Sequence, residues 1–357
     1  MTGAGDMRDT LARLGYSQRV EDLFGSMRDD GFFPARVVRV DRGMPLVTSD
    51  SGTERVEVAV HLMRTTGAGS RVVVGDWVAI ARPPGHDLPL IEAILPRSSA
   101  FTRKDPGGQA EEQVVAANID AVFIVQSLVP DGPNLRRLER ELVLSWESGA
   151  RPVVVLTKAD LCRDAGPARE AVRAIAHGVD VHVVSGVTRE GVDALMAYAD
   201  GDATIALLGA SGVGKSTLVN AMVGKDVQAT AEVRVADGKG RHTTVAREIV
   251  LMPGSGVLVD TPGMRALALW DSEQGLAAAF SDIARLAEEC RFRDCTHVTE
   301  PGCAVTAAVD GGDLHGLRLE SYHRLRDELD QLAVHREARA RKSEAQTKRG
   351  RTKRGRD

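Results

Sequence analysis

One glycine-rich segment constrains the fold of this chain more than any other feature. Residues 209–216 read GASGVGKS, which fits the phosphate-binding pattern G-x-x-x-x-G-K-[ST]. An apolar run precedes it, and helical spacing follows it. Such a loop works between a strand and a helix, because the turn aims backbone N–H groups at phosphate oxygens and the helix N-terminus adds positive potential. We therefore expect an α/β nucleotide-binding domain whose phosphate contacts come from Gly209, Ala210, Ser211, Gly212, Val213, Gly214, Lys215, Ser216 and Thr217.

Two side chains of this loop and one later motif predict a magnesium-dependent triphosphate site. Lys215 is expected to reach the β- and γ-phosphates, and the Ser216 hydroxyl is expected to ligate Mg²⁺. The motif DTPG follows another apolar run, so Asp260 stands at a strand end where it can hold Mg²⁺ through water. The N–H of Gly263 can then face the γ-phosphate.

Two other strand ends predict that the base is guanine. A carboxylate at the end of the motif TKAD can accept hydrogen bonds from both N1–H and N2–H of guanine, a donor pair that adenine lacks. A Ser-Gly pair after the next apolar run can offer a backbone N–H to guanine O6. The expected base contacts are Thr157, Lys158, Asp160, Ser185 and Gly186. An ATP-driven enzyme is the alternative, and Asp160 argues against it.

The order of these motifs is unusual. The base-recognition segments precede the phosphate-binding loop, whereas most GTPases run the other way. A ring of strands and helices can be opened at a different loop without loss of the sheet. We therefore expect a circularly permuted P-loop GTPase domain over residues 116–269, with a mostly parallel sheet covered on both faces.

A cluster of cysteines and one histidine predicts a metal site in a C-terminal helical domain, residues 270–336. The ligands are spaced as Cys-x4-Cys-x-His-x5-Cys, and three thiolates with one imidazole form the set of a closed tetrahedral zinc site. The alternative is a group of free thiols or a disulfide, which a reducing compartment disfavours. The expected ligands are Cys290, Cys295, His297 and Cys303, and Cys162 stands apart as a small hydrophobe.

The N-terminal third predicts a small β-barrel. Short β-branched runs separated by Gly and Asp turn signals occupy residues 34–100, and an OB-fold is the simplest arrangement of about five such strands. Barrels of this kind bind single-stranded nucleic acid in some proteins and are purely structural in others. We expect residues 1–33 to be an extension outside the core and residues 101–115 to be a flexible linker. The expected strands are residues 35–40, 56–60, 72–74, 77–80 and 90–94.

Charge is distributed unevenly along the chain. The net charge is −4, yet the last 22 residues hold ten Lys/Arg and three acidic residues, so the rest of the chain is acidic. We expect residues 337–357 to be a basic disordered tail, either solvated or in contact with RNA. The polar start of the chain and the lack of a long apolar run favour a cytoplasmic protein without a membrane span.

The chain closely resembles the RsgA (YjeQ) family of small ribosomal subunit biogenesis GTPases, from about Pro34 to about Arg336. The marks of this resemblance are the permuted order, the cysteine–histidine cluster and the motif GRHTT at residues 240–244. The resemblance implies a multi-domain protein with an N-terminal OB-fold, a central GTPase and a C-terminal zinc domain. It also implies a GTPase activity stimulated by the small (30S) ribosomal subunit and its 16S rRNA during late maturation.

The motif GRHTT and the residue after DTPG bear on which residues perform hydrolysis. Thr243 or Thr244 is expected to be the switch threonine that ligates Mg²⁺, and the sequence does not choose between them. Met264 follows the DTPG motif where many GTPases carry a glutamine that orients water, so intrinsic hydrolysis is expected to be slow. His242 is a candidate to orient that water, and a solvated histidine is the alternative interpretation.

Two classes of function compete. In the first, the protein is a GTP-hydrolysing checkpoint enzyme with GTP/GDP, Mg²⁺ and one structural Zn²⁺ as cofactors and the small subunit as partner. In the second, it is an RNA-binding scaffold in which nucleotide is structural and turnover is incidental. A monomer is the expected state.

Overall fold

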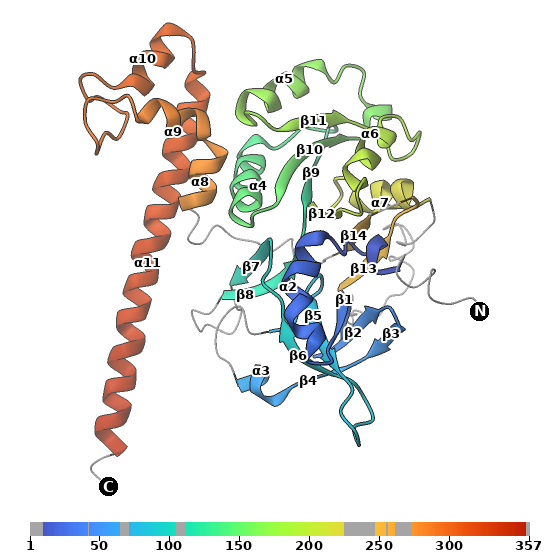
Figure 1. The fold of residues 1–357 in the computed structure, drawn as a ribbon. Coiled ribbons are helices and arrows are strands. Elements are labelled where there is room, and N and C mark those ends of the chain that lie inside the picture. The colour runs from blue at the N-terminus through green and yellow to red at the C-terminus, as the bar shows by residue number, and fades with distance from the viewer. Residues whose placement is uncertain are drawn as a thin grey trace, which may run out of the picture.

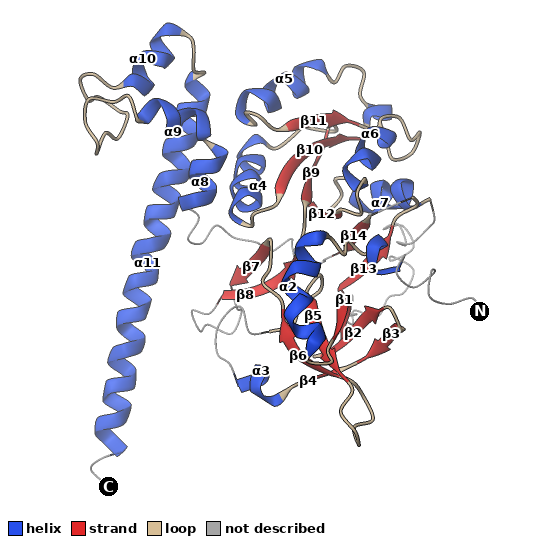
Figure 2. Cartoon of the chain, in the orientation of Figure 1, coloured by secondary structure: helices blue, strands red, loops and turns tan. Residues whose placement is uncertain are grey.

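The structure is a computed structural model that describes residues 10–41, 43–64, 71–104, 112–224, 247–254, 256–260 and 273–354. It has three parts: a barrel, an α/β sheet domain and a helical C-terminal region that continues into a long projecting helix (Figure 1). Strands dominate the first part and helices the last (Figure 2). Among the described helices, none is both long and apolar enough to cross a bilayer.

The barrel is closed by the segment that contains β3 (Gly52–Arg55) and β4 (Glu57–Val58), because β3 pairs with one end of the sheet and β4 pairs with the other. Its other elements are β1 (Phe33–Asp41), β2 (Met44–Ser49), α3 (Val60–Arg64), β5 (Trp77–Ala81) and β6 (Leu90–Ile94). β1 pairs with β2 and β5, and β5 pairs with β6. β3 pairs with β2, and β4, just beyond it, runs parallel to β6. This closed order is that of an OB-fold, as the sequence predicted.

Three details of the barrel differ from the prediction. The strand expected over residues 56–60 covers only Glu57–Val58, and helix α3 begins at Val60. Residues 72–74 form no strand, because the N–H of Val73 donates to the buried Asp76 carboxylate at 2.8 Å and the chain turns there. β2 and β3 were not predicted, because Pro45 interrupts the β-branched pattern of β2 and β3 contains no large apolar residue.

The central domain is a six-stranded sheet in the order β11-β10-β9-β12-β14-β13. Only β13 is antiparallel to its neighbour; the other pairings are parallel. Its strands are β9 (Ala121–Ser127), β10 (Arg151–Thr157), β11 (Asp180–Val183), β12 (Thr204–Leu208), β13 (Arg247–Leu251) and β14 (Val257–Asp260). The central strands β9 and β10 are buried along almost their whole length, as expected for a sheet covered on both faces.

Helices cover this sheet on two sides. Leu138 of α4 (Leu135–Glu147) and Val172 of α5 (Gly166–Ile175) share one apolar core. Val192 of α6 (Val192–Met196) and Leu218 of α7 (Lys215–Val223) share the other core. Two short 3-10 turns, η1 (Ala159–Leu161) and η2 (Ala197–Ala199), complete the domain.

The prediction that residues 1–33 lie outside the core is wrong. Helix α2 (Gln18–Asp29) packs across the barrel, and Leu14 and Phe24 are buried in the core that also holds α4 and α5. Buried Arg36 of β1 fixes this arrangement, because its guanidinium donates to the carbonyl oxygen of Leu14 and, at 2.8 Å, to Thr204 Oγ1 of β12. The amphipathic spacing was visible in the sequence, but its distant partner was not.

The predicted linker is partly a hairpin. β7 (Ala100–Lys104) pairs antiparallel with β8 (Glu112–Ala117), and residues 105–111 lie outside the described residues. Phe101 and Val115 are buried in the main core. The polar and glycine residues in the middle of this segment favoured the prediction of a linker, although the residues at its two ends are apolar enough to form paired strands.

The C-terminal region packs on α4 of the central domain. Its helices are α8 (Glu273–Ala279), α9 (Ser281–Ala287), α10 (Ala304–Gly311) and α11 (Gly316–Arg354). Buried Glu139 of α4 accepts hydrogen bonds from Ser321 and Arg324 of α11. Arg318 forms an ion pair with Asp282 at 2.6 Å and donates to the carbonyl oxygen of Ile175 in α5.

The prediction of a disordered tail also differs from the structure. Helix α11 continues through Arg354, so most of residues 337–357 are helical. Arg, Lys, Ala, Glu and Gln dominate this stretch, and these residues favour helix even without packing partners. Helix propensity therefore outweighs the high charge of this stretch.

Candidate nucleotide site and metal cluster

The phosphate-binding loop joins β12 to α7 with the expected strand–loop–helix geometry. Gly209 begins the loop with φ 141°, and a Cβ atom there would lie 2.4 Å from the carbonyl oxygen of Val125 in β9, so glycine is required. Gly214 precedes α7, whose first turn contains Lys215, Ser216 and Thr217. Lys215 Nζ donates to the carbonyl oxygen of Gly209 at 2.8 Å, which places its charge over the loop.

The two base-recognition segments are joined by a side-chain hydrogen bond and by a backbone hydrogen bond from the Ala159 N–H to the carbonyl oxygen of Val184 at 3.2 Å. Ser185 Oγ donates to Asp160 Oδ1 at 2.6 Å. The same Ser185 oxygen accepts from the N–H groups of Val187 and Thr188 at 3.2 and 3.0 Å, which fixes the orientation of the hydroxyl. One carboxylate has about four acceptor positions, so Asp160 can bind Ser185 and a pair of ligand N–H donors together.

Lys158 and Gly186 adopt backbone positions that suit the same site. Lys158 is left-handed, with φ 63°, which turns the chain between β10 and the Asp160 turn. Gly186 lies close to α7, because a Cβ atom there would be 3.1 Å from the Thr217 backbone carbon. The loop after β11 therefore touches the helix that starts at the phosphate-binding loop.

Thr157 has a different position from the predicted one. Its side chain is buried, and its hydroxyl lies within hydrogen-bonding reach of two backbone carbonyl oxygens, Gln126 at 3.1 Å and Val213 of the phosphate-binding loop. Thr157 thus links the base-recognition strand to the phosphate-binding loop, and its hydroxyl is engaged by backbone rather than by a ligand position.

Gln126 and Glu141 form a supporting network that the sequence analysis missed. Gln126 Nε2 donates to Glu141 Oε2 at 2.8 Å, and Gln126 Oε1 accepts from the Asn134 N–H at 3.2 Å. Burial raises the pKa of Glu141. Hydrogen bonds from Arg137 and Gln126 and the positive charge of Lys215 act to lower this pKa, but burial outweighs them. The available signal was a polar residue at the end of the apolar strand 121–125, since carboxyl ends of parallel strands line binding sites.

The remaining predicted residues are only partly within the described structure. Asp260 ends β14, where its backbone pairs with Glu248 of β13, as a residue at a strand end should. Gly263 lies outside the described residues, and so do His242, Thr243 and Thr244. Their roles stay predictions.

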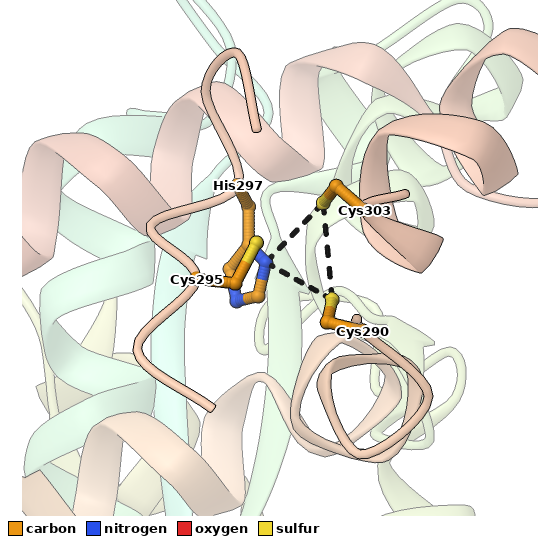
Figure 3. Close-up of side chains that lie close together, drawn as sticks. All are labelled: Cys290, Cys295, His297 and Cys303. Carbon is orange, nitrogen blue, oxygen red and sulfur yellow. Dashed lines mark hydrogen bonds between the residues drawn. The ribbon is translucent and has the colours of Figure 1, made fainter. Parts of the chain in front are cut away.

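The cysteine–histidine cluster is assembled from three elements (Figure 3). Cys290 follows α9, Cys303 caps the N-terminus of α10, and Cys295 and His297 lie on the loop between them. All four potential ligand atoms lie within 4.8 Å of one another. His297 Nδ1 is 3.6 Å from Cys290 Sγ and 3.5 Å from Cys303 Sγ, and these two sulfurs are 3.8 Å apart.

These distances fit tetrahedral zinc. Zinc bonds sulfur at about 2.3 Å and nitrogen at about 2.0 Å, and tetrahedral angles then separate two sulfurs by about 3.8 Å and sulfur from nitrogen by about 3.5 Å. Two sulfurs 3.8 Å apart are not in a disulfide, and all four cysteines of the chain are free. The cluster is therefore compatible with a closed structural metal site.

The thiols of the cluster differ in acidity. Burial acts to raise the pKa of Cys303, but hydrogen bonds from Thr306 and His297 outweigh it and lower that pKa to about 6. Burial and the neighbouring thiols raise the pKa of Cys295 to about 11. Cys303 caps α10, where the helix N-terminus also favours a thiolate, so it is the best preformed anionic ligand.

Comparison with known proteins agrees with this geometry. The RsgA GTPase family model matches residues 94–270. The small ribosomal subunit biogenesis GTPase RsgA of Streptomyces coelicolor is 44% identical over 344 residues, which cover 95% of this chain and 92% of that protein. The protein of the same name from Methanosarcina acetivorans is 48% identical over 261 residues, covering 73% and 70%.

Solved structures show the same fold. The crystal structure of YjeQ from Thermotoga maritima is 26% identical, with a TM-score of 0.63 over 84% of this chain and 98% of that chain. YloQ, described as a circularly permuted GTPase, has a TM-score of 0.59 at 22% identity, covering 84% of this chain and 96% of that chain. The permuted motif order, the phosphate-binding loop and these likenesses agree: the chain belongs to the RsgA family of circularly permuted GTPases and is a GTP-hydrolysing enzyme.

Proposed function

We propose that this GTPase binds the small (30S) ribosomal subunit through 16S rRNA and hydrolyses GTP to GDP and phosphate during late maturation of that subunit. One observation supports it most: relatives that match along most of their length carry the name small ribosomal subunit biogenesis GTPase, and the nucleotide site of the chain is assembled in the matching permuted order. The protein would act as a checkpoint that grips the subunit with GTP bound and leaves after hydrolysis.

Two groups of residues at the carboxyl ends of the strands would hold the guanine nucleotide, one at the base and one at the phosphates. Asp160, oriented by Ser185, would accept the N1–H and N2–H groups of guanine, and the stem of Lys158 would pack along the base. The backbone of residues 209–214 and Lys215 would bind the phosphates. Ser216 and, through water, Asp260 would hold Mg²⁺, while Gly263 would face the γ-phosphate.

Hydrolysis would depend on the switch segment. Thr243 or Thr244 would ligate Mg²⁺, and His242 would orient the attacking water in the complex with RNA. His242→Ala tests this role: subunit-stimulated hydrolysis should fall by about 100-fold or more if a general acid–base residue is lost, while GTP affinity is retained. Normal stimulated turnover in this variant would eliminate His242 as the catalytic group.

The cysteine–histidine cluster would hold one structural Zn²⁺. With Cys290, Cys295, His297 and Cys303 as ligands, every tetrahedral position is filled and the site has no place for a reacting water. The ion would fix the loop that exposes Phe292, with the Arg291 guanidinium 5.5 Å above its ring. An aromatic ring paired with arginine suits stacking against RNA bases.

The experiment that tests the proposal is co-sedimentation of the full chain with purified 30S subunits, with 50S subunits as control. Binding to 30S subunits that is at least tenfold tighter with a non-hydrolysable GTP analogue than with GDP supports a nucleotide-timed checkpoint. Equal binding in both states, with turnover unaffected by subunits, would favour the alternative of an RNA scaffold with incidental turnover. A cytoplasmic monomer is the form we propose for this activity.

A further inference from the structure

The barrel and the GTPase domain share one continuous sheet. Along one edge, β1 pairs with β5 from Phe33 to Arg36 and then with β13 of the GTPase domain. The second pairing consists of two residue pairs, Arg39 with Glu248 and Val40 with Arg247. The barrel is therefore joined to the GTPase domain by backbone pairing as well as by side-chain packing.

This ladder leads directly to the magnesium side of the nucleotide site. Glu248, which pairs with Arg39 on one side, pairs with Asp260 on the other. Arg39, Glu248 and Asp260 thus form one row across β1, β13 and β14. Neighbouring strands lie about 4.8 Å apart, so two strand spacings separate the barrel residue from the backbone of Asp260.

The position of β13 in the chain adds to its importance. The strand begins at Arg247, three residues after Thr244, the last residue of the GRHTT motif. A displacement of β13 therefore acts on both halves of the γ-phosphate sensor: it moves the strand partner of Asp260, and it moves the point where the predicted switch segment ends. Few strands in this fold are placed to do both.

Side-chain charges tune this connection. Arg39 Nη1 lies 3.7 Å from Glu248 Oε2, and Arg39 Nε lies 2.8 Å from Asp41 Oδ2 within the barrel. Arg55, from β3, reaches the same Asp41 oxygen at 2.8 Å. These groups are partly exposed, so each ion pair alone is weak. A ladder of two residue pairs is short, however, and a small change across it alters how often it opens.

We propose that Arg39 and Glu248 are positioning residues that couple the barrel to the nucleotide site through the β1–β13–β14 row. An RNA strand that binds the barrel shifts or stiffens β1, and the pairing transmits this change to the backbone of Asp260 and to the end of the switch segment. The identity of the ligand rests on the proposed function, whereas the coupling rests on the strand pairing. Coupling between two sites is reciprocal, so nucleotide exchange must also change β1.

The first experiment measures the coupling factor, which is the ratio of 30S affinities with a non-hydrolysable GTP analogue and with GDP. Arg39→Glu and Glu248→Arg each place like charges opposite each other, and each should reduce the factor by about two- to fivefold. The double variant restores opposite charges and should restore the factor. Arg82→Glu is the matched control, since Arg82 is an exposed barrel arginine that pairs with Glu54 and follows β5, which pairs with the Phe33–Arg36 end of β1 and not with the Arg39 end that meets β13.

Each outcome of this experiment decides the proposal. Recovery in the double variant supports it, because a simple loss of positive charge toward RNA would persist there. Unchanged ratios in both single variants, or a ratio reduced equally by Arg82→Glu, would overturn it.

A second experiment needs no ribosome. Hydrogen exchange of the full chain, compared between GDP and the GTP analogue, should show at least a twofold change in exchange rate for amides of residues 39–41 and 247–251. The change should shrink in Arg39→Glu and return in the double variant. If the wild type fails to bind 30S subunits, the proposed function fails while this measurement still judges the coupling, and equal exchange in both nucleotide states would refute it.

Discussion

Ser185 Oγ donates to Asp160 Oδ1 at 2.6 Å, and this side-chain bond joins the loops that follow two adjacent strands, β10 and β11. A free aspartate at an exposed turn would sample several rotamers. The hydroxyl restricts the carboxylate to an orientation in which its remaining acceptor positions can meet a purine edge. In the proposed base site, guanine selectivity would then depend on both residues, although only the carboxylate carries charge.

Asp160→Asn tests this assignment. The amide keeps the size of the side chain but removes the charge that strengthens two N–H bonds, and a bond to a charged group is worth about 1.5–3 kcal/mol. GTP affinity should fall by about 10- to 100-fold, with little change in the weak affinity for ATP, as measured by nucleotide titration of the full chain.

Ser185→Ala is the graded partner of this variant, because it leaves the charge and removes only the group that orients it. Its loss of GTP affinity should be smaller, at about three- to tenfold. A preference for GTP over ATP that survives Asp160→Asn would contradict the assignment of the base site.

Thr157→Val tests the link between base and phosphate recognition. Valine has the shape of threonine but lacks the hydroxyl, so the buried Val213 carbonyl oxygen loses its Thr157 partner, at a cost of about 1–3 kcal/mol. Both the free energy of unfolding and the affinity for GDP should fall. Denaturant titration and GDP titration measure the two quantities.

Thr157→Ser, which retains a hydroxyl, is the control and should stay close to the wild type in both measurements. Loss of GDP affinity in the serine variant as large as in the valine variant would mean that the methyl group, rather than the hydrogen bond, matters.

Acidification should release the proposed zinc and loosen the C-terminal domain. The pKa of Cys303 is lowered to about 6 in the folded chain from an ordinary 9.0, so its thiolate adds stability that is complete above about pH 9 and is lost as pH falls through about 6. Protons also compete with the metal for all three thiolates. Bound zinc, measured by elemental analysis after dialysis, should fall steeply below about pH 6 while GTP binding persists.

Cys162→Ser is the matched control for Cys295→Ser in this experiment, since Cys162 lies outside the cluster. The Cys295 variant should lose zinc at a higher pH than the wild type, and the Cys162 variant should not. Equal zinc content in all three proteins would exclude the cluster as the metal site.

Arg318→Ala should separate the C-terminal domain from the GTPase domain. The guanidinium is almost fully buried, pairs with Asp282 at 2.6 Å and lies 4.4 Å above the Phe280 ring. Its removal leaves a largely buried carboxylate and a carbonyl oxygen of α5 without their partner, which costs about 3–5 kcal/mol. Thermal unfolding should show an early transition for the C-terminal helices.

Arg140→Ala is the corresponding control, because Arg140 pairs with Glu328 across the same interface but is exposed. Its cost should stay below about 1 kcal/mol. If both variants unfold alike, the buried Arg318 guanidinium has no special role in joining the C-terminal helices to α5.

Local patterns predicted the parts of the structure that are local in the chain. The phosphate-binding loop, the motif order and the metal cluster each lie within short segments, where spacing alone carries the geometry. The hydrogen bond between Thr157 and Val213 joins positions 56 residues apart, and neither residue type predicts it. That contact depends on the register of β10, β9 and β12, and this register cannot be deduced from the sequence.

The N-terminal helix shows the same limit. The spacing of Leu11, Leu14, Val20 and Phe24 indicates an apolar face, but nothing near them says what covers it. The structure shows what covers this face: buried Arg36 donates hydrogen bonds to the carbonyl oxygen of Leu14 and to Thr204, which holds the N-terminal segment against the barrel and β12. A charged residue inside a β-branched run was the one clue, since buried charges need partners.

The most direct test of the account is the initial rate of GTP hydrolysis by the full chain, alone and with purified 30S subunits, 50S subunits or free 16S rRNA, with ATP as the nucleotide control and Lys215→Ala as the inactive control. We expect slow hydrolysis by the protein alone and at least tenfold stimulation by 30S subunits only, specific for GTP. A GTP hydrolysis rate that 30S subunits leave unchanged, or that 50S subunits raise equally, would contradict the account.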